Sequence, residues 1–263
     1  MPKFSIITIC KNVEADIERT IESVLTQNYT DYEYIIVDGA STDNTCQIVK
    51  QHNKRVTKFI SEPDTGIYDA MNKGIKLAVG EYLLFLNAGD NLLHENVLTI
   101  VAEQLAGCVV DVFFGHILVL DKQTGEAWIP AQSAYLNKLI VLTNQPMHQA
   151  AFIRRVAFAK VGLYDTKFQI AGDYDWFLKA FLLYRCTYQY YDFVCSVFVR
   201  GGLCNRSDEQ TMSLNRRERD IVIGRYCGWG MHLIYRWNFL YKCLFCLNIY
   251  GRKVLKKVLK LSK

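Results

Sequence analysis

The sequence has no run of about twenty uncharged apolar residues, which is the length that a membrane-spanning helix needs. It shows no pattern of a secretory signal peptide either, because its first apolar run, Phe4–Cys10, has only the length of a strand. The nine cysteines are odd in number and lack the paired spacing of a disulfide framework. We therefore expect a protein of the reducing cytoplasm without a transmembrane helix.

Two glycine-rich phosphate-binding patterns are also missing. Neither GxGxxG nor GxxxxGK[ST] occurs, which weakens dinucleotide-binding and P-loop interpretations. In contrast, hydrophobic residues make up 51% of the 263 positions and charged residues 22%. This balance lets the chain bury a substantial core and excludes an intrinsically disordered protein.

The positive charge is concentrated at the C-terminus. Residues 252–263 hold six Lys or Arg and no acid, which leaves 25 bases and all 26 acids for the other 251 residues. The preceding segment mixes Trp, Tyr and Phe with isolated bases such as Arg236 and Lys242, a composition typical of a helix in the bilayer interface. We expect residues 227–263 to be basic, aromatic helices that bind a membrane surface. The alternatives are packing on the protein body and, less favoured because no recognition motif accompanies the bases, nucleic-acid binding.

Strand-like and helix-like patterns alternate over the first ninety residues. Continuous apolar runs predict buried strands, and apolar residues at helical spacing predict the helices between them. The expected strands are residues 4–10, 34–37, 56–60 and 82–86, and the expected helices are residues 16–27, 41–50 and 67–79. This order, with short connections, predicts a parallel, doubly wound half-sheet with right-handed crossovers.

The pattern beyond residue 90 is mixed instead of strictly alternating. We expect helices at residues 94–105, 173–183 and 208–226, and strands at residues 109–120, 147–153 and 188–198. A turn at residues 122–125 leads into a short strand through Trp128. The chain therefore predicts an α/β domain followed by a different C-terminal segment.

Polar residues follow the expected strands at one edge of the sheet. Thr8 and Asp38 stand at the ends of the first two strands, Asp64 follows the third, and Asp90 closes the turn after the fourth. Ligands of open parallel α/β sheets bind beyond the carboxyl ends of the strands, so these residues predict a cleft. A carboxylate such as Asp90 suits a divalent cation held against phosphate oxygens, although an ordinary helix-capping turn has the same composition.

Five motifs occur together in the chain: SIITICKN, YIIVDGASTDNT, SEPDTGIYDAMNKG, GEYLLFLNAGD and AGDYDWFLKA. In this order the set resembles the family 2 glycosyltransferases, closest to the branch that builds bacterial surface polysaccharides of the colanic-acid type. The resemblance implies a GT-A fold, which is a Rossmann-like, mixed, mostly parallel sheet flanked by helices. It places this domain at residues 1–226, with residues 1–106 as the nucleotide-binding half and 107–226 as the acceptor-binding half, and leaves 227–263 as an amphipathic helical extension.

The resemblance also implies a donor site. Thr8 and Asp38 would contact the nucleotide base, and Asp64 and Lys73 would lie near the base and the diphosphate respectively. Asn87 stands where the family's metal motif has an acid, and it would contact the donor. Two further residues, His148 and Arg200, are weaker candidates for the donor site. The alternative for His148 is a purely structural role, and for Arg200 an ordinary loop position.

A metal ligand and a catalytic base follow from the same resemblance. Only the last acid of the family's aspartate cluster is present, so Asp90 would hold Mg²⁺ or Mn²⁺. The family's Glu-Asp pair has become Gly172-Asp173, so Asp173 would be the base that deprotonates the acceptor hydroxyl. Asp175 is a weaker candidate because it points elsewhere on the same helix.

The function implied is an inverting, hexosyltransferase-type glycosyltransferase of surface polysaccharide biosynthesis. It would move a sugar from a nucleotide-diphosphate donor, most commonly a UDP-sugar and alternatively a GDP-sugar, to a lipid-linked or polysaccharide acceptor on the inner face of the plasma membrane. A nucleotidyltransferase is disfavoured because the loop of residues 10–14, CKNVE, has no glycine. A sugar-nucleotide-binding subunit without transfer activity is the other alternative, and retention of Asp38, Asp90 and Asp173 argues against it.

Overall fold

A computed structural model describes residues 1–200 and 209–227 of the chain. The segment predicted to bind membranes, residues 227–263, lies outside the described residues apart from Cys227. Within the described part, no helix has the length and apolar character needed to cross a membrane.

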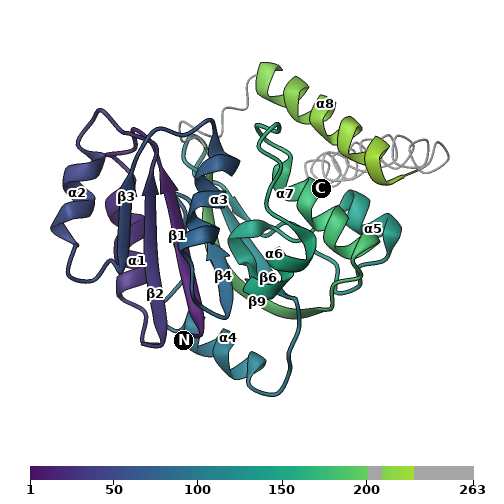
Figure 1. The fold of residues 1–263 in the computed structure, drawn as a ribbon, viewed down its shortest axis with the longest axis horizontal. Helices are drawn as coiled ribbons and strands as arrows, with labels where there is room; N and C mark the ends of the chain where they lie inside the picture. Colours follow the sequence, from purple (N-terminus) through teal and green to yellow (C-terminus); the bar gives the residue numbers. More distant parts are fainter. Residues whose placement is uncertain (201–208, 228–263) are drawn as a thin grey trace, which may run out of the picture.

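The strands of the described residues form one mixed sheet (Figure 1). Its order is β3-β2-β1-β4-β8-β6-β9-β5, with β7 paired to β6 outside this path. The predicted parallel half-sheet is confirmed, because β1 pairs in parallel with both β2 and β4, and β2 with β3. The strands are β1 (Phe4–Cys10), β2 (Tyr32–Asp38), β3 (Lys58–Ser61), β4 (Tyr82–Phe85), β5 (Asn91–Leu92), β6 (Val112–Asp121), β7 (Ala127–Trp128), β8 (Ala151–Arg154) and β9 (Tyr188–Arg200).

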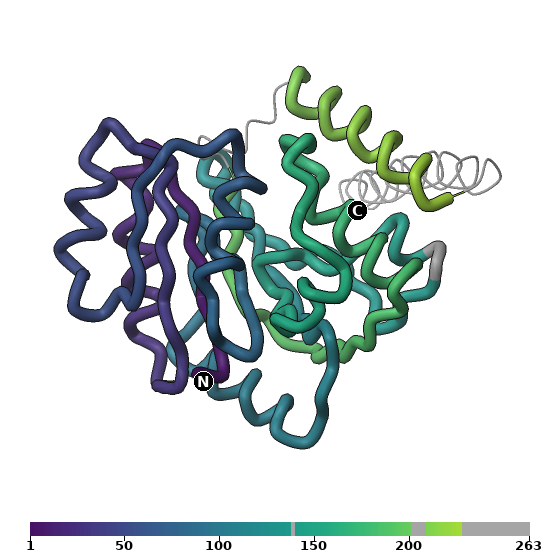
Figure 2. Tube along the Cα trace, in the orientation of Figure 1, coloured from purple at the N-terminus to yellow at the C-terminus, as the bar shows by residue number. Residues whose placement is uncertain are grey.

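The second half of the sheet is joined to the first through an antiparallel strand. β8 runs antiparallel to both β4 and β6, so β4 and β6 point the same way, and β9 is parallel to β6. The ends of β1, β4, β6 and β9 therefore meet at one edge of the sheet. The trace shows both halves side by side along this single sheet (Figure 2).

Helices cover both faces of the sheet, and the alternation of side chains along the strands explains why. In β1, Ile7 and Ile9 join one buried apolar cluster while Phe4 and Ile6 join the other. The first cluster packs against α3, α5, α6, α7 and α8, and the second against α1, α2 and α4. The helices are α1 (Ile17–Leu25), α2 (Thr45–Gln51), α3 (Ile67–Leu77), α4 (Val97–Leu105), α5 (Lys138–Thr143), α6 (Arg155–Val161), α7 (Gly172–Leu178) and α8 (Glu209–Tyr226).

Two predicted elements near the sheet edge differ from the sequence-based expectation. The first strand has its expected bounds, Phe4–Cys10, but Thr8 lies two residues before its end and does not terminate it. The expected strand at residues 147–153 begins as the 3-10 helix η1 (His148–Ala150), and only then becomes β8. The expected helix at residues 173–183 is split into α7 and the π-helix η2 (Lys179–Leu183). The spacing of apolar residues in the sequence does not distinguish a 3-10 or π-helical turn from a strand or an α-helix.

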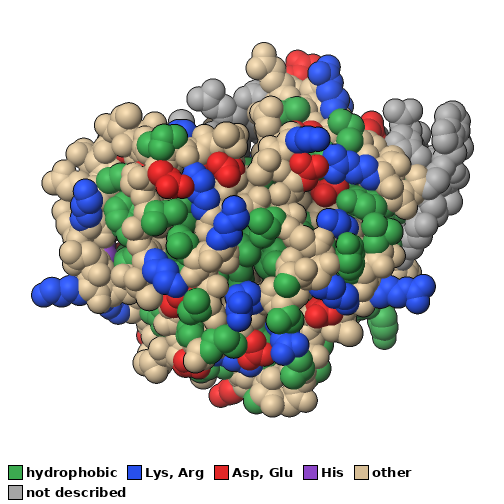
Figure 3. All heavy atoms as spheres, in the orientation of Figure 1, with side chains coloured by type: hydrophobic (Ala, Val, Ile, Leu, Met, Phe, Trp, Pro, Cys, Tyr) green, Lys and Arg blue, Asp and Glu red, His purple; other side chains and the backbone are tan. Residues whose placement is uncertain are grey.

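The surface of the body carries both signs of charge. On the face drawn in Figure 3, Lys and Arg side chains are interspersed with Asp and Glu. This mixture agrees with the near-equal numbers of bases and acids outside residues 252–263. The described body therefore presents no single-sign field on this face that would favour a polyanion such as nucleic acid.

A buried carboxylate stabilises the start of the sheet, and its removal provides a test. Glu33 on β2 is 4% exposed and accepts hydrogen bonds from Ser5 Oγ at 2.6 Å, Lys58 Nζ at 3.0 Å and the N–H of Val79 at 2.6 Å. Burial works to raise the pKa of Glu33, but these hydrogen bonds outweigh burial and lower it.

We expect Glu33→Gln to lower the free energy of unfolding at pH 7 by about 1–3 kcal/mol, because an amide cannot accept from all of these donors. A lowered pKa in the folded state gives stability that is present above the ordinary Glu pKa and lost as pH falls through the folded value. Urea unfolding at pH 7 and near pH 3 should therefore show the difference between Glu33→Gln and wild type shrink in acid. Glu22→Gln on the exposed side of α1 is the matched control. An equal difference at both pH values would contradict this account.

Candidate active site

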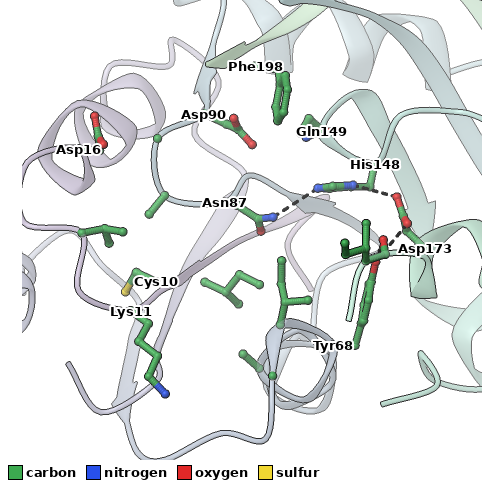
Figure 4. A pocket seen from close by; sticks show the side chains of 18 of the residues that line it. Cys10, Lys11, Asp16, Tyr68, Asn87, Asp90, His148, Gln149, Asp173 and Phe198 are labelled. Atoms are coloured by element: carbon green, nitrogen blue, oxygen red, sulfur yellow. Dashed lines mark hydrogen bonds and ion pairs between the residues drawn. The ribbon is translucent and has the colours of Figure 1, made fainter. Parts of the chain in front are cut away.

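A cavity of about 560 Å³ lies at the edge of the sheet where the strand ends meet (Figure 4). Its lining comes from the loop after β1, the start of α3, the turn after β4, η1, the start of α7 and the end of β9. Several predicted site residues share this lining: Asp64, Asn87, Asp90, His148 and Asp173. The structure therefore brings together residues that are more than a hundred positions apart in the sequence.

Asp173 lies at the start of α7 and is held by three donors. The His148 Nδ1 lies 3.1 Å from its Oδ2, and its Oδ1 accepts from the N–H of Tyr174 at 2.8 Å and from Tyr68 Oη at 3.2 Å. Burial works to raise the pKa of Asp173, but the hydrogen bond from His148 and the other donors outweigh it and lower that pKa. The carboxylate is therefore ionised at neutral pH and fixed in direction.

His148 connects Asp173 to the turn after β4. Its Nε2 lies 3.3 Å from the Asn87 Nδ2, while its Nδ1 faces Asp173. An arrangement in which Nδ1–H donates to Asp173 and Nε2 accepts from the Asn87 amide satisfies both contacts with a neutral imidazole. The 3-10 geometry of η1, which the sequence pattern did not indicate, positions His148 in this chain of contacts.

Tyr68 explains why the acid expected before Asp173 is a glycine. A Cβ at Gly172 would lie 2.7 Å from carbons of the Tyr68 ring, so the ring occupies the space that a side chain there would need. The same Tyr68 donates its hydroxyl to Asp173 and to the Ile170 carbonyl at 2.5 Å. Tyr68 was not predicted as a site residue. It lies within the SEPDTGIYDAMNKG motif, but on the buried face of α3, where an aromatic side chain is ordinarily part of the core.

Asp90 is brought to the cavity by a tight turn. Gly89 has φ +103°, a conformation that side-chain-bearing residues rarely adopt, and its N–H donates to Thr20 Oγ1 at 2.9 Å. Arg19 donates to the Gly89 carbonyl at 3.1 Å, so α1 anchors the turn. Asp90 itself is 5% exposed, and burial raises its pKa to about 7 against the opposing influence of His148.

The chemistry of Asp90 fits a divalent cation held by one protein carboxylate. A buried carboxyl with a raised pKa is a group that a bound cation would stabilise in its charged form. Among the described residues there is no group of three or more His, Cys, Asp or Glu with metal-binding geometry. Any cation here would therefore take most of its ligands from phosphate oxygens and water, which Mg²⁺ accepts readily.

Two lysines that are not among the predicted site residues line the cavity. Lys11, in the loop after β1, lies 3.9 Å from the Asp64 carboxylate and has a side chain that is 54% exposed. Lys122, in the turn after β6, lies 2.6 Å from Asp16. Asp16 occupies the N-cap position of α1, but its side chain makes no capping hydrogen bond and forms ion pairs with Lys122 and Arg19 instead. Both lysines therefore bring positive charge to the cavity wall, each beside a carboxylate.

Two residues expected to read the base are buried outside the cavity lining. Thr8 is fully buried in β1 and hydrogen bonds to the Leu86 carbonyl at 2.8 Å and to Tyr34 Oη. Asp38 accepts from the N–H and hydroxyl of Ser41, from Ser61 Oγ and from Cys46 Sγ. Burial works to raise the pKa of Asp38, but the bonds from Ser41 and Ser61 outweigh it and lower that pKa. The next three residues, Ile9, Cys10 and Lys11, line the cavity instead of Thr8.

Asp38 still shapes the neighbouring wall through Gly39. A Cβ on Gly39 would overlap the Asp64 carboxylate, so the DG sequence lets Asp64 approach the end of β2. Asp64 lies in the lining as expected and accepts from the N–H of Gly66 at 3.1 Å.

The other two predicted donor contacts lie beside the cavity instead of in its lining. Lys73 on α3 forms ion pairs with Glu62 at 3.0 Å and Asp69 at 3.7 Å, and donates to the Pro63 carbonyl. Its pKa is raised by the hydrogen bond to Glu62 and the charge of Asp69. Arg200 is exposed at the end of β9, whereas Phe198 and Val199 just before it line the cavity.

Asp175, the weaker candidate for the base, points away from the cavity as expected. Its Oδ1 accepts from Arg225 and from Tyr226 Oη, each at 3.0 Å. Burial raises the pKa of Asp175 despite these partners on α8. The residue joins α7 to α8 and is a structural contact.

A mixed, mostly parallel sheet flanked by helices, with a cavity at its strand ends, is an α/β architecture of the GT-A type, as the sequence predicts. Residues 5–162 match the family described as Glycosyl transferase family 2, and the chain belongs to this family. A PGL/p-HBAD biosynthesis glycosyltransferase of Mycobacterium tuberculosis is 32% identical over 209 residues, which cover 78% of this chain and 80% of the relative. A second glycosyltransferase of that organism, described as uncharacterized, is 34% identical over 188 residues, covering 69% of this chain and 70% of the relative.

Solved structures share the fold. S. aureus TarS 1-349 in complex with UDP-GlcNAc aligns with a TM-score of 0.67 and 21% identity, over 84% of this chain and 66% of that chain. The mannosyltransferase PcManGT from Pyrobaculum calidifontis, in complex with GDP-Man and Mn2+, aligns with a TM-score of 0.65 and 16% identity, over 85% of this chain and 64% of that chain. This chain spans just under two thirds of either protein, and at these identities the likeness establishes the fold alone.

Proposed function

We propose that this glycosyltransferase transfers a hexose, with inversion, from a nucleotide-diphosphate sugar to a lipid-linked or polysaccharide acceptor in surface polysaccharide biosynthesis. The observation that carries the proposal is an Asp173 carboxylate held by hydrogen bonds from His148, Tyr174 and Tyr68, in a cavity whose lining also contains Asp90 and Lys11. A base and a cationic phosphate subsite within one cavity are the two requirements of a direct displacement at the anomeric carbon.

The proposed step uses Asp173 as the general base. The acceptor hydroxyl gives its proton to the Asp173 carboxylate while its oxygen forms a bond to the anomeric carbon. The bond from that carbon to the diphosphate oxygen breaks, and the nucleoside diphosphate leaves with the electron pair. Because bond formation and bond breaking occur on opposite faces of the sugar, the anomeric configuration inverts. His148 and Tyr68 keep the carboxylate directed during this step.

The donor subsite would lie between Asp64 and the turn that ends at Asp90. Lys11 and Lys122 border this part of the cavity and would neutralise the diphosphate. A UDP-sugar is the preferred donor and a GDP-sugar the alternative, in line with the UDP-GlcNAc and GDP-Man that TarS and PcManGT hold. The biosynthetic role of the mycobacterial relative supports a cell-surface glycolipid or polysaccharide as the acceptor class. Residues 227–263 would hold the enzyme at the membrane where such acceptors lie.

Donor turnover tests the proposed reaction directly. Purified protein would be incubated with UDP-GlcNAc or GDP-mannose, with water as the acceptor, and release of the nucleoside diphosphate would be followed. NMR of the freed sugar would report its anomeric configuration, because inversion of an α-linked donor yields the β-anomer first. Release of α-sugar would contradict inversion. Binding of donor without any turnover would support the sugar-nucleotide-binding subunit.

A divalent cation at Asp90 would stabilise the negative charge that develops on the leaving diphosphate. We expect Asp90→Ala to weaken UDP binding in the presence of Mn²⁺ by at least about tenfold, the lower end of losses seen when a metal site is impaired. Calorimetric titration of UDP, GDP and dTDP, with Mn²⁺ and with a chelator, measures this effect. Asp192→Asn, whose side chain is 88% exposed and lies outside the cavity lining, is the control. Equal affinity with and without Mn²⁺ would contradict a role for the cation in donor binding.

A further inference from the structure

A buried glutamate on α8 binds the segment that leads into α7. Glu218 is 6% exposed, and its carboxylate accepts three backbone N–H groups. The N–H of Gln169 donates to Oε1 at 2.8 Å, and those of Ile170 and Ala171 donate to Oε2 at 2.9 and 2.8 Å. Asp173 follows two residues later, so one side chain fixes three consecutive peptide groups directly before the proposed base.

The same segment is held from the opposite side by Tyr68. Its hydroxyl donates to the Ile170 carbonyl at 2.5 Å and to Asp173 Oδ1 at 3.2 Å. Glu218 accepts the hydrogen bond of the Ile170 N–H. The N–H and the carbonyl of Ile170 are therefore both bound to side chains from distant parts of the chain. Gln169 and Ile170 line the cavity together with Asp173. A shift of this segment would therefore move the cavity wall and the base together.

Helix α8 is itself fastened to α7 and its neighbours, so Glu218 has a rigid support (Figure 1). The Arg219 guanidinium lies 3.8 Å from the centre of the Tyr174 ring. Arg225 pairs with Asp165 and Asp175, each at 3.0 Å. Val222 and Ile223 are fully buried in the apolar cluster that also contains α7. These contacts place the Glu218 carboxylate independently of any ligand in the cavity.

We propose that Glu218 is a positioning residue for Asp173, so that α8 determines how fast the base works without contacting the substrate. This role rests on the proposed function of Asp173. Glu218 lies beyond residues 5–162, the part of the chain that matches the family. A carboxylate is needed because its two oxygens accept all three N–H groups, whereas Gln has a single acceptor oxygen and would turn its NH₂ group toward remaining N–H donors. At least one buried N–H then loses its partner, and the segment shifts to regain it.

The test compares Glu218→Gln with wild type in donor turnover, using UDP-GlcNAc and GDP-mannose. We expect kcat to fall about tenfold, since sub-ångström displacement of a base is costly and a full 1 Å costs about 100-fold. KM for the donor and the affinity for the nucleoside diphosphate should remain within about twofold of wild type, because Lys11, Asp64 and Asp90 do not depend on this segment. Glu209→Gln, an exposed residue of the same helix, is the matched control.

A purely stabilising role for Glu218 predicts a different result. Glu218→Gln would then lower the melting temperature, but the folded fraction would turn over donor with the wild-type kcat. Glu218→Asp, which keeps the charge, provides a second variant should the amide variant fold poorly, and it should retain more activity than Glu218→Gln. In a double-mutant cycle with Tyr68→Phe, the two losses in kcat should be non-additive, because both side chains hold the Ile170 peptide groups.

The outcomes separate this role from the proposed function. A wild-type kcat in folded Glu218→Gln would overturn the positioning role alone. A loss confined to KM or to nucleotide affinity would also overturn it, because the defect would then lie in donor binding. If the wild-type protein turns over neither donor, the proposed function fails, and the role of Glu218 fails with it.

Discussion

Asp173→Asn is expected to lower transfer by about 10²- to 10⁴-fold, the contribution typical of a positioned general base. The amide has nearly the same shape as the carboxylate but cannot take the proton of the acceptor hydroxyl at neutral pH. The lysines and Asp90 at the donor end of the cavity are unchanged, so nucleotide affinity should stay close to that of wild type. Nucleotide release from the donor measures the first effect, and calorimetric titration measures the second.

The control for Asp173→Asn is Asp192→Asn, which removes one carboxylate from an exposed position outside the cavity lining. Wild-type turnover by Asp173→Asn would show that another group accepts the proton, and the assignment of the base would be wrong. Loss of nucleotide binding together with turnover would indicate a structural role for Asp173. The predicted combination, normal binding with little turnover, distinguishes catalysis from both alternatives.

The parallel half of the sheet was predictable from the sequence because β1, β2 and β4 are buried on both faces. Runs such as Phe4–Cys10 have no polar side, and only a sheet covered by helices on both faces can bury them. Positions of residues at strand ends follow from the same logic, which is why Asp64 and Asp90 were expected at the cavity. Thr8 shows the limit of this reasoning, because a residue only two positions before the strand end is buried in the core and does not reach the cavity edge.

The contacts that fix Asp173 were not predictable, because they join residues with no shared pattern in the sequence. Tyr68 and Trp176 are both aromatic residues on buried helix faces, yet the Tyr68 hydroxyl donates to the base whereas the Trp176 indole N–H donates to the Gly162 carbonyl. Glu218 lies in a charged helix, where a solvated side chain is the ordinary expectation. Its burial depends on the three N–H groups that the fold brings to it. Long-range hydrogen bonds of this kind are a property of the assembled structure.

His148→Ala is expected to lower turnover at neutral pH by about 10- to 100-fold, because a misdirected base is less effective even when it is ionised. It should also change the pH dependence. Burial works to raise the pKa of Asp173, and the hydrogen bond from His148 is the largest influence that lowers it. Without the imidazole the pKa of Asp173 rises, so a larger fraction of the base is protonated in mild acid.

The acid limb of the profile of kcat/KM against pH should therefore move to higher pH in His148→Ala, since this limb reports protonation of the base in the free enzyme. In wild type the lowered pKa of Asp173 keeps the base ionised through the mildly acidic range. His52→Ala, which removes an imidazole paired with Glu18 between α1 and α2, controls for loss of a histidine elsewhere. A limb that stays in place while kcat falls would mean that His148 orients Asp173 without tuning its charge. A limb that moves to lower pH would contradict the contact seen here, because removing a donor to a buried carboxylate can only favour its protonated form.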